Sequence, residues 1–509
     1  MSKKVRVRFA PSPTGGLHLG GVRTVLYNFL FARHFGGDFI LRIEDTDQSR
    51  FVEGAENYIV ECLHWCGMFP DESPATGGPY APYRQSERKS NYRAYAEKLV
   101  ADGFAYYAFD TPEELDEMRT RYKSELNPSP QYDYQLRTKM RNSLTLSVDE
   151  VTRFISEGVP YVIRIKMPDQ EIVHFIDMIR GEVSFNTATV DDKVLLKNDG
   201  MPTYHLAVVV DDYTMKITHA FRGEEWLPSA PVHILLWKYL GWLDEMPQWA
   251  HLPLILKPDG NGKLSKRDGD RLGFPVFAMN WTDPRTNDST QGFRERGFLP
   301  EAFVNMLAML GWNDGSSQEI FTMDELIARF SMDRVHKGGA KFDFEKAKWF
   351  NHEWIKRSTA ARLFPDVKKI LESNNLSVTD DSYLLQVIDM VKERCTLLPD
   401  FYEQSKFFFA APDTIDADSI RPKWTPEKQL FFTDLQNLLA GLPDYSAALI
   451  ESTFKELALA RNIKVGELQL PFRIMLVGGK FGPAVFDIAA AIGKDQTMLR
   501  LKNGLAWLA

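Results

Sequence analysis

A histidine inside a glycine-rich turn is the first group in this chain that could do chemistry. Residues 5–23 read VRVRFAPSPTGGLHLGGVR. Apolar and charged residues alternate at 5–9 before the turn, and apolar residues recur at helical spacing over 22–35 after it. This order predicts a strand, a phosphate-binding turn and a helix, because the N–H groups and dipole at a helix N-terminus attract anions. His18 could donate a hydrogen bond to phosphate, although a lone histidine is more often structural.

A second motif is the basic sequence KLSKR at residues 263–267, set in the glycine-rich stretch PDGNGKLSKRDGD. Considered in isolation, such a stretch is most simply a solvated basic loop. Its functional interpretation is a mobile clamp in which Lys266 neutralises charge on a departing polyphosphate.

The elements that must position these groups follow from the hydrophobic pattern. Residues 1–104 alternate strands with helices, which predicts an α/β fold with a Rossmann-like, doubly wound parallel sheet. We expect strands at 5–9 and 38–43 and helices at 22–35, 54–66 and 87–102. That rhythm is interrupted over residues 105–198, where a helical stretch (110–126) and short β-like pieces (160–168, 172–185) predict an inserted α+β module.

The α/β pattern resumes at residues 203–223, where Tyr204 is expected on an apolar strand, and continues with a helix near 228–240. From residue 300 onward, apolar residues recur at helical spacing and strands nearly vanish. The last third of the chain is therefore predicted to be all-helical. The polar residues at 282–292 predict a surface loop.

Composition limits the class of protein. With 509 residues, 44% hydrophobic and 26% charged, the chain has the composition of a multidomain globular protein. It has no apolar run near the ~20 residues that span a bilayer, and the strand expected at residue 5 leaves no room for a leader peptide. Three cysteines do not suggest a disulfide framework. We expect a cytoplasmic protein with no membrane partner.

The net charge of −8 means that any nucleic acid would have to bind a local basic patch. One such patch is HKGGAKFDFEKAKWF at residues 336–350, in which aromatic residues alternate with lysines.

In their order and wide separation, the His18 turn and the KLSKR loop resemble the HIGH and KMSKS signatures of class I aminoacyl-tRNA synthetases. The strings APSPTGGLHLGG, LRIEDTD, TYHLA and FRGEEW resemble the bacterial type of glutamyl-tRNA synthetase, and this similarity covers essentially the whole chain. One departure is Gly21, which replaces the last histidine of HIGH and shifts more charge stabilisation onto Lys266.

The resemblance implies a reaction in which glutamate and ATP form an adenylate and pyrophosphate, and the glutamyl group then passes to tRNA(Glu). Mg²⁺ is expected only as the counter-ion of ATP. Catalysis would depend on positioning and on electrostatic stabilisation, with no covalent enzyme intermediate. The resemblance implies that three residues contact the phosphates in catalysis: His18, Lys263 and Lys266. It implies that five residues bind the nucleotide: Thr14, His18, Gly20, Glu225 and Lys266.

A glutamate pocket needs a cation for the side-chain carboxylate and an anion for the ammonium group. Arginine suits the first task because its planar fork binds carboxylate in bidentate fashion. The resemblance places these residues around glutamate: Arg8, Ala10, Ser12, Glu44, Tyr204 and Arg222. Without the motifs, a structural ion-pair network would explain the charged members as well. Val208 stands where many relatives have asparagine, so one polar contact is expected to be missing or supplied by another group.

The resemblance also implies a division into functional regions. These are the two halves of the Rossmann catalytic domain (1–104 and 199–255), an acceptor-stem module (105–198), a stem-contact domain with the KLSKR loop (256–358) and a helical anticodon-binding region (359–509). Asp47 is expected near the tRNA terminus, and Arg394 and Arg473 near the anticodon.

By the same resemblance, Arg394 favours an enzyme that charges only glutamate tRNA, although an arginine that merely packs on a helix is the alternative. A relaxed form that also charges tRNA(Gln) with glutamate stays open. An enzyme that glutamylates an anticodon base would lack the long C-terminal region. A catalytically dead tRNA-binding module would be expected to have lost His18, Lys266 or Arg222.

No metal site is predicted. Cys62, His64 and Cys66 have a ligand-like spacing, but only the two cysteines share a helix face. Family members with zinc carry it in the inserted module, where this chain has no cysteine. Residues 271–293 resemble an insertion after the KLSKR loop. A loop that extends the tRNA-facing surface is one interpretation, and an insertion without a role is the favoured one. The default expectation for the oligomeric state is a monomer.

Overall fold

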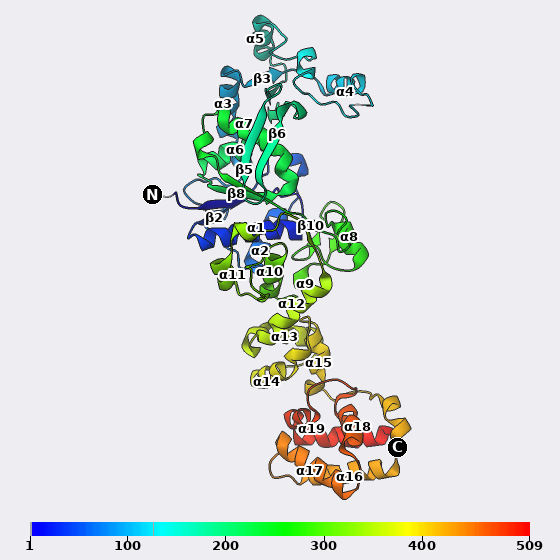
Figure 1. Ribbon diagram of the computed structural model, residues 1–509. Coiled ribbons are helices and arrows are strands. Elements are labelled where there is room, and N and C mark those ends of the chain that lie inside the picture. The colour runs from blue at the N-terminus through cyan, green and yellow to red at the C-terminus, as the bar shows by residue number, and fades with distance from the viewer. Residues whose placement is uncertain (1–2, 126, 509) are drawn as a thin grey trace. The chain divides into compact units, whose positions relative to one another are not determined.

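A computed structural model describes residues 3–125 and 127–508 and divides the chain into two compact units (Figure 1). The first unit runs up to Phe293 and includes Phe303–Asp343, and the second comprises Arg294–Ala302 and the chain from Phe344 onward. The helix-like stretch predicted at 110–126 ends on residue 126, which lies outside the described residues. Within those residues, no helix is long and apolar enough to cross a membrane.

A six-stranded sheet forms the centre of the first unit, in the order β2-β1-β8-β9-β5-β6. Its strands are β1 (Arg6–Phe9), β2 (Asp38–Leu41), β5 (Ile172–Asp177), β6 (Gly181–Asn186), β8 (His219–Gly223) and β9 (Gln248–Leu252). All neighbours are parallel except β5 and β6, which form an antiparallel pair. All four residues of β1 are buried, as expected for the interior of a parallel sheet. The predicted Rossmann-like class is confirmed.

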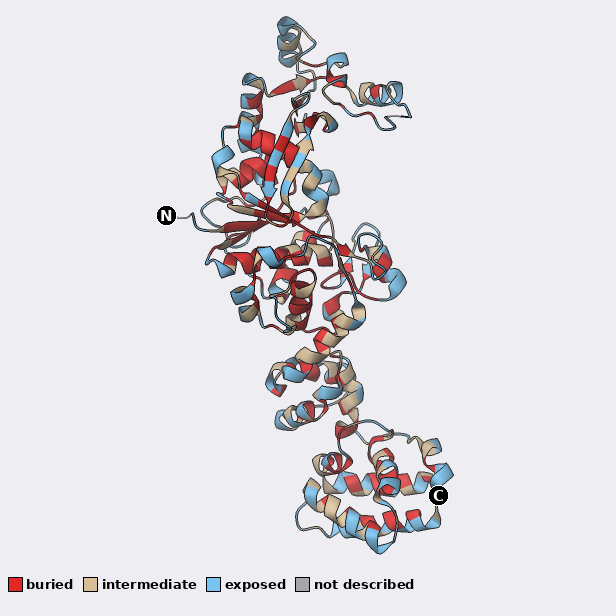
Figure 2. Ribbon diagram, in the orientation of Figure 1, coloured by how far each residue is buried: buried red, intermediate tan, exposed pale blue. Residues whose placement is uncertain are grey.

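The helix α1 (Leu19–His34) connects β1 to β2 and packs on both. Its N-cap is His18, and its last turn contains Arg33 and His34, cations that suit the negative end of a helix dipole. Helices α6 (Tyr204–Thr214) and α7 (Ala230–Tyr239) lie on the opposite face of the sheet from α1 (Figure 1). Helices on both faces bury β1 and most of β2 and β8 (Figure 2).

One expectation about this region was wrong. Tyr204 does not lie on an apolar strand, because YHLAVVVDD forms most of α6, with Thr203 as its N-cap. The run Leu206–Val210 is buried on all sides between the sheet and its neighbours, so it lacks the polar face that normally reveals a helix. Val208 is one of these buried residues.

The segment expected as an inserted module is divided between two sheets. Its β3 (Ala105–Ala108), β4 (Val162–Ile165) and β7 (Val194–Leu196) form a separate three-stranded sheet, whereas β5 and β6 extend the central one. Alternation of exposed and buried residues along β5 gives a half-buried strand. The boundaries 105–198 therefore do not coincide with an independent sheet, and the domain limits stay a prediction.

The other strands of the first unit are short: β10 (Ile255–Leu256), β11 (Trp281–Thr282), β12 (Ser289–Thr290) and β13 (Ala340–Lys341). Its other helices are α2 (Ala55–Trp65), α3 (Lys89–Ala101), α4 (Pro112–Arg121), α5 (Val148–Ser156), α8 (Lys266–Leu272) and α11 (Met323–Arg329). The residues of α9 (Phe293–Arg296) and α10 (Pro300–Met309) are divided between the two units. Capping boxes begin α4, α5 and α11, which explains why these helices start where they do.

The second unit is built from helices, as predicted. They are α12 (Phe344–Arg357), α13 (Ala360–Ser373), α14 (Asp381–Val391), α15 (Asp400–Phe409), α16 (Pro426–Ala440), α17 (Ala447–Ala460), α18 (Val465–Val477) and α19 (Val485–Leu508). Phenylalanines hold the core together, with Phe454 about 5 Å from the rings of Phe431, Phe472 and Phe486. Helix α19 is broken at Gly493, whose φ of 81° is accessible to glycine.

Candidate active site

A cavity of about 910 Å³ opens at the carboxyl ends of β1, β2 and β8, where open α/β sheets bind ligands. It collects most of the predicted site residues, namely Arg8, Ala10, Ser12, Thr14, His18, Gly20, Glu44, Asp47, Tyr204, Arg222, Glu225 and Lys263. These residues come from segments more than 200 positions apart, which the sheet topology brings together. Lys266, Arg394 and Arg473 are not among the residues that line the cavity.

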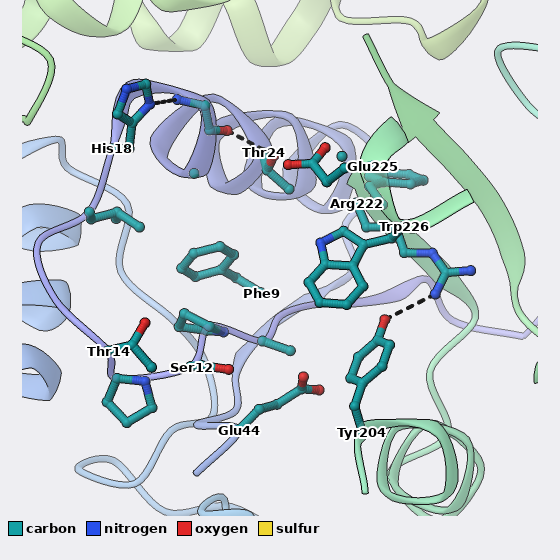
Figure 3. A pocket seen from close by; sticks show the side chains of 18 of the residues that line it. Phe9, Ser12, Thr14, His18, Thr24, Glu44, Tyr204, Arg222, Glu225 and Trp226 are labelled. Atoms are coloured by element: carbon teal, nitrogen blue, oxygen red, sulfur yellow. Dashed lines mark hydrogen bonds between the residues drawn. The ribbon is translucent and has the colours of Figure 1, made fainter. Parts of the chain in front are cut away.

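His18 presents a hydrogen-bond donor at the N-terminus of α1 (Figure 3). Its Nδ1 accepts from the backbone N–H of Gly20 at 3.3 Å, which places the ring proton on Nε2. Nε2 is buried and has no partner among the described residues. Burial, together with Lys263, lowers the pKa of His18 to about 4, so the ring is neutral near pH 7. A neutral N–H donor beside a helix N-terminus suits a phosphate oxygen.

Part of the apparent insertion at 271–293 supports this turn. The backbone N–H of Leu19 donates to the carbonyl of Val276 at 3.0 Å, and the ring of Phe277 packs edge-on against His18. A Cβ on Gly16 would lie only 2.9 Å from Trp281, so glycine is needed for this close approach. The favoured interpretation, an insertion without a role, does not fit these contacts, which sequence spacing alone could not reveal.

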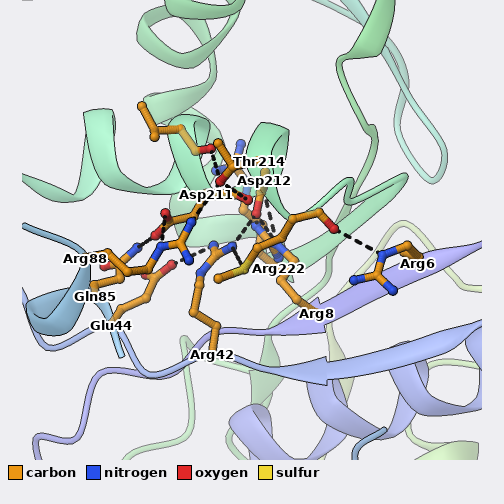
Figure 4. Close-up of polar contacts among 12 residues, drawn as sticks. Arg6, Arg8, Arg42, Glu44, Gln85, Arg88, Asp211, Asp212, Thr214 and Arg222 are labelled. Carbon is orange, nitrogen blue, oxygen red and sulfur yellow. Dashed lines mark hydrogen bonds and ion pairs between the residues drawn. The ribbon is translucent and has the colours of Figure 1, made fainter. Parts of the chain in front are cut away.

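Arg8 and Glu44 belong to a buried, charge-balanced network (Figure 4). Nε of Arg8 lies 3.1 Å from Oδ1 of Asp212, and Arg42 bridges Asp212 at 2.8 Å and Glu44 at 3.0 Å. Burial alone would raise the pKa of Asp212, but Arg8 and Arg42 hold it below the usual value. Two cations thus face two anions. Arg8 and Glu44 thus take part in an ion-pair network and also line the cavity, and Arg42 and Asp212 are members of the network that the sequence analysis missed.

Arg222 has a different environment. Its Nη1 donates to the hydroxyl of Tyr204 and contacts Nδ1 of His233, both at 3.1 Å, and its Nε donates to Nε2 of His251 at 3.0 Å. The guanidinium also lies over the Trp249 ring at 4.9 Å. Its Nη2 is buried without a partner, and Arg222 forms no ion pair with any carboxylate of the described residues.

The neighbours of Arg222 are neutral. Burial and Arg222 itself lower the pKa of His233 well below its usual value, and burial lowers the pKa of His251. Burial also raises the pKa of Tyr204. Arg222 is therefore a cation at the cavity wall that has no counter-ion in its own unit.

The nucleotide end of the cavity holds an exposed ion pair between Lys263 and Glu225, at 2.5 Å. Exposed pairs of this kind contribute only ~0–1 kcal/mol, so a ligand can replace either partner at little cost. Lys266 lies just beyond this pair as the first residue of α8, whose N-cap Ser265 shares a capping box with Asp268. Thr14 lines the same cavity from the turn after β1 (Figure 3).

Asp47 lines the cavity and is exposed, which places it at the rim. Its carboxylate accepts from the Ser49 hydroxyl at 2.6 Å, which lowers the pKa of Asp47. Lys197 and Arg50 line the same rim and were missed by the sequence analysis, since neither belongs to a recognisable motif.

In the second unit, Arg394 and Arg473 converge on one loop. Nε of Arg394 donates to the carbonyl of Gly482 at 3.2 Å, and Nη1 of Arg473 donates to the carbonyls of Phe481, Gly482 and Pro483 at 2.6–3.1 Å. Two residues 79 positions apart therefore form a single basic cluster beside Phe481, whose side chain is partly exposed.

The described residues contain no group of three or more histidine, cysteine or acidic side chains that could hold a metal ion. Cys62 in α2 and Cys66, the C-cap of that helix, are both buried, whereas His64 is exposed, as the helical spacing predicted. Burial raises the pKa of the Cys66 thiol far above its usual value, which disfavours the thiolate that a metal requires.

Comparison with known proteins is consistent with this geometry. Residues 4–349 match the family described as tRNA synthetases class I (E and Q), catalytic domain, and residues 358–505 match an anticodon binding domain. The glutamate–tRNA ligase of Amoebophilus asiaticus is 51% identical, over 99% of this chain and 98% of its own length. The corresponding ligase of Cytophaga hutchinsonii is 50% identical, over 100% and 98%.

A crystal structure of a glutamate tRNA ligase from Elizabethkingia meningosepticum, in complex with its amino acid, superimposes with a TM-score of 0.95 at 51% identity and covers 100% of both chains. The chain therefore belongs to the glutamate–tRNA ligases of the class I tRNA synthetases.

Proposed function

We propose that this chain activates L-glutamate with ATP and transfers it to tRNA(Glu), using the cavity at the ends of β1, β2 and β8. The observation that carries the proposal is Arg222, a cation at the cavity wall that is surrounded by neutral partners. A substrate carboxylate supplies the missing negative charge, and arginine binds carboxylate through two parallel N–H donors.

Selection of glutamate over glutamine follows from this arrangement. A neutral amide at the same place would leave the arginine without a counter-charge, which costs several kcal/mol, roughly 2–5. Glu44 supplies the anion for the substrate ammonium, and Tyr204 lies between Glu44 and Arg222 (Figure 3). Burial raises the pKa of Glu44, although Arg42 and Arg8 act against it, so this carboxylate gains from an added positive charge. Arg8, Ala10 and Ser12 complete the walls.

ATP occupies the end of the cavity formed by the His18 turn. Nε2–H of His18 and the N-terminus of α1 contact phosphate oxygens, Thr14 and Gly20 line the nucleotide, and Glu225 exchanges Lys263 for a ribose hydroxyl. Lys263 and Lys266 then neutralise charge on the departing pyrophosphate. Mg²⁺ enters with ATP, and the described residues offer no cluster of ligands for a further metal, zinc included.

Two displacements complete the reaction. A carboxylate oxygen of glutamate attacks the α-phosphorus of ATP, and the bond to pyrophosphate breaks to give the mixed anhydride. A hydroxyl of the terminal ribose of tRNA then attacks the carbonyl carbon, and AMP leaves. The protein contributes position and electrostatic stabilisation, because neither step needs an enzyme nucleophile.

The tRNA terminus approaches at the rim near Asp47, with the 105–198 and 256–358 regions contacting the acceptor stem. The cluster of Arg394 and Arg473 meets the anticodon through the 359–509 region. A relaxed form that also charges tRNA(Gln) is not favoured by any observation. The monomeric state and the cytoplasmic location stay predictions from the sequence.

The experiment is aminoacylation of total tRNA with labelled glutamate and labelled glutamine, followed by identification of the charged tRNA. We expect glutamate on tRNA(Glu) only. Glutamine attachment, or no attachment of either amino acid with active tRNA, would refute the proposal.

A further inference from the structure

Two buried residues stand directly behind Arg222. In the register of the central sheet, Arg222 on β8 is paired with His251 on β9. Asp177, at the end of β5, is paired with Trp249, which also belongs to β9. Nε of Arg222 donates to Nε2 of His251 at 3.0 Å, and Nδ1 of His251 contacts Oδ2 of Asp177 at 2.6 Å. Asp177 and His251 are 1% and 0% exposed, so water does not mediate or screen these contacts.

The Asp177 carboxylate is fully occupied by N–H donors. Oδ1 accepts from the backbone N–H groups of Ile179 and Arg180, both at 2.9 Å, and Oδ2 accepts from the backbone and ring N–H groups of His251 at 3.0 and 2.6 Å. Burial would raise the pKa of Asp177, but these hydrogen bonds lower it, so the group is ionised. The proton of His251 therefore resides on Nδ1, and Nε2 presents a lone pair to Arg222.

A second acceptor is set in the same way. Nδ1 of His233 contacts Nη1 of Arg222 at 3.1 Å, and Nε2 of His233 contacts Nδ1 of His205 at 3.2 Å. His233 thus directs its lone pair to the arginine and its proton to His205. Arg222 is held on two sides by neutral acceptors, whereas the negative charge of Asp177 lies one residue farther away.

We propose that Asp177 and His251 are positioning residues for amino-acid selection, which orient the Arg222 guanidinium without neutralising it. The inference rests on the proposed function and adds the residues that make Arg222 selective. A carboxylate in direct contact would orient the arginine equally well, but it would cancel the charge that the substrate must meet. A neutral imidazole fixed by a carboxylate behind it provides the orientation alone, as in the histidines that bind metals.

A matched pair of substitutions separates this role from simple packing. In His251→Gln, the side-chain carbonyl can take the place of Nε2 and accept from Arg222. In His251→Asn, the shorter amide reaches only the place of Nδ1, so the contact with Asp177 is kept and the acceptor for Arg222 is lost. His219→Gln is the control, because His219 is a histidine of β8 in the same sheet that does not line the cavity.

The assay is ATP–pyrophosphate exchange in the presence of tRNA(Glu), with KM measured separately for glutamate and ATP. For His251→Asn, we expect the KM for glutamate to rise about tenfold to a hundredfold, because a hydrogen bond to a charged group is lost. The KM for ATP and the kcat should each change by less than about threefold. His251→Gln should recover most of the loss, and His219→Gln should behave as the unaltered protein.

Asp177→Asn gives an independent test. An amide nitrogen would face N–H donors whichever way it is turned. When it faces His251, the ring must move its proton to Nε2 and lose the contact with Arg222, and when it faces Ile179 and Arg180, the anion that fixes His251 is still lost. We expect weaker glutamate binding and a smaller preference for glutamate over glutamine. If this variant does not fold, the pair at His251 still decides the question.

The inference is overturned if His251→Asn and His251→Gln behave alike, or if glutamate and ATP are affected equally. Failure of the proposed function would look different, because the unaltered protein would then not charge tRNA with glutamate at all.

Discussion

The two ends of the amino-acid pocket differ in whether the charge of a buried arginine is balanced by a carboxylate of the protein. Arg8 and Arg42 share Asp212, and Arg42 also holds Glu44, so their charges are balanced within the protein. Arg222 is surrounded by Tyr204, His233 and His251, and its charge is left uncompensated. The first region balances its charges internally, which favours stability, whereas the second keeps a cation for recognition, although both present arginines to the same cavity.

The largest effect is expected for Asp212→Asn, which removes the anion that two buried arginines share. Breaking a buried ion pair by removing one partner costs ~3–5 kcal/mol. We expect the free energy of unfolding of the first unit to fall by this amount in urea denaturation. The corresponding change at Asp244, which is exposed, should have little effect. Unchanged stability of Asp212→Asn would remove the distinction between the two regions.

Lys266→Ala tests whether the nucleotide end works independently of both arginine regions. Removing one group that stabilises a transition state costs roughly 10²–10³-fold in rate. We expect adenylate formation to fall by about 10²-fold or more, with stability and the KM for glutamate unchanged, in single-turnover measurements. Normal rates would exclude Lys266 from the reaction.

The pH dependence of glutamate binding examines the balanced region. Because burial raises the pKa of Glu44, this carboxyl becomes protonated, and loses its attraction for the substrate ammonium, at a higher pH than an ordinary glutamate. The KM for glutamate should therefore rise as the pH falls, starting above the usual range for a carboxyl. His18, with its pKa lowered to about 4, should add no step near pH 6.5. A KM for glutamate that stays flat down to the ordinary carboxyl range would contradict the role of Glu44.

The smallest effect is expected at Arg394, outside both regions. Its single hydrogen bond to Gly482 is exposed, so Arg394→Gln should leave stability within about 0.5 kcal/mol, as is usual for surface substitutions. We expect weaker discrimination between glutamate and glutamine tRNAs, measured by charging each purified tRNA. Equal discrimination in the variant would leave Arg394 as a loop support only.

Much of this arrangement could be predicted from the sequence, because local patterns encode it. The alternation at residues 5–9 and the glycines before His18 predicted β1, the turn and α1 at nearly their true limits. Tyr204 was misplaced because a helix buried on all sides has the same apolar run as a strand. The membership of β5 in the central sheet depends on pairing with β9, some 70 residues away, which no local pattern contains.

For the site, the sequence predicted the members but not the contacts between them. Motifs identified Arg8, Glu44 and Arg222, but they could not say which arginine was neutralised, since Asp212 and His251 lie far along the chain from their partners. Charge balance in a pocket is a property of the folded structure. The sequence lists the charged residues of the pocket, but it does not show which of them contact one another.

The most direct test of the uncompensated cation is Arg222→Gln, assayed for glutamate and glutamine by ATP–pyrophosphate exchange with tRNA(Glu) and by thermal unfolding. We predict that the preference for glutamate over glutamine falls by at least about thirtyfold, equivalent to ~2 kcal/mol, while the KM for ATP and the unfolding midpoint change little. A preference that is retained, or a loss of stability as large as that of Asp212→Asn, would contradict the account.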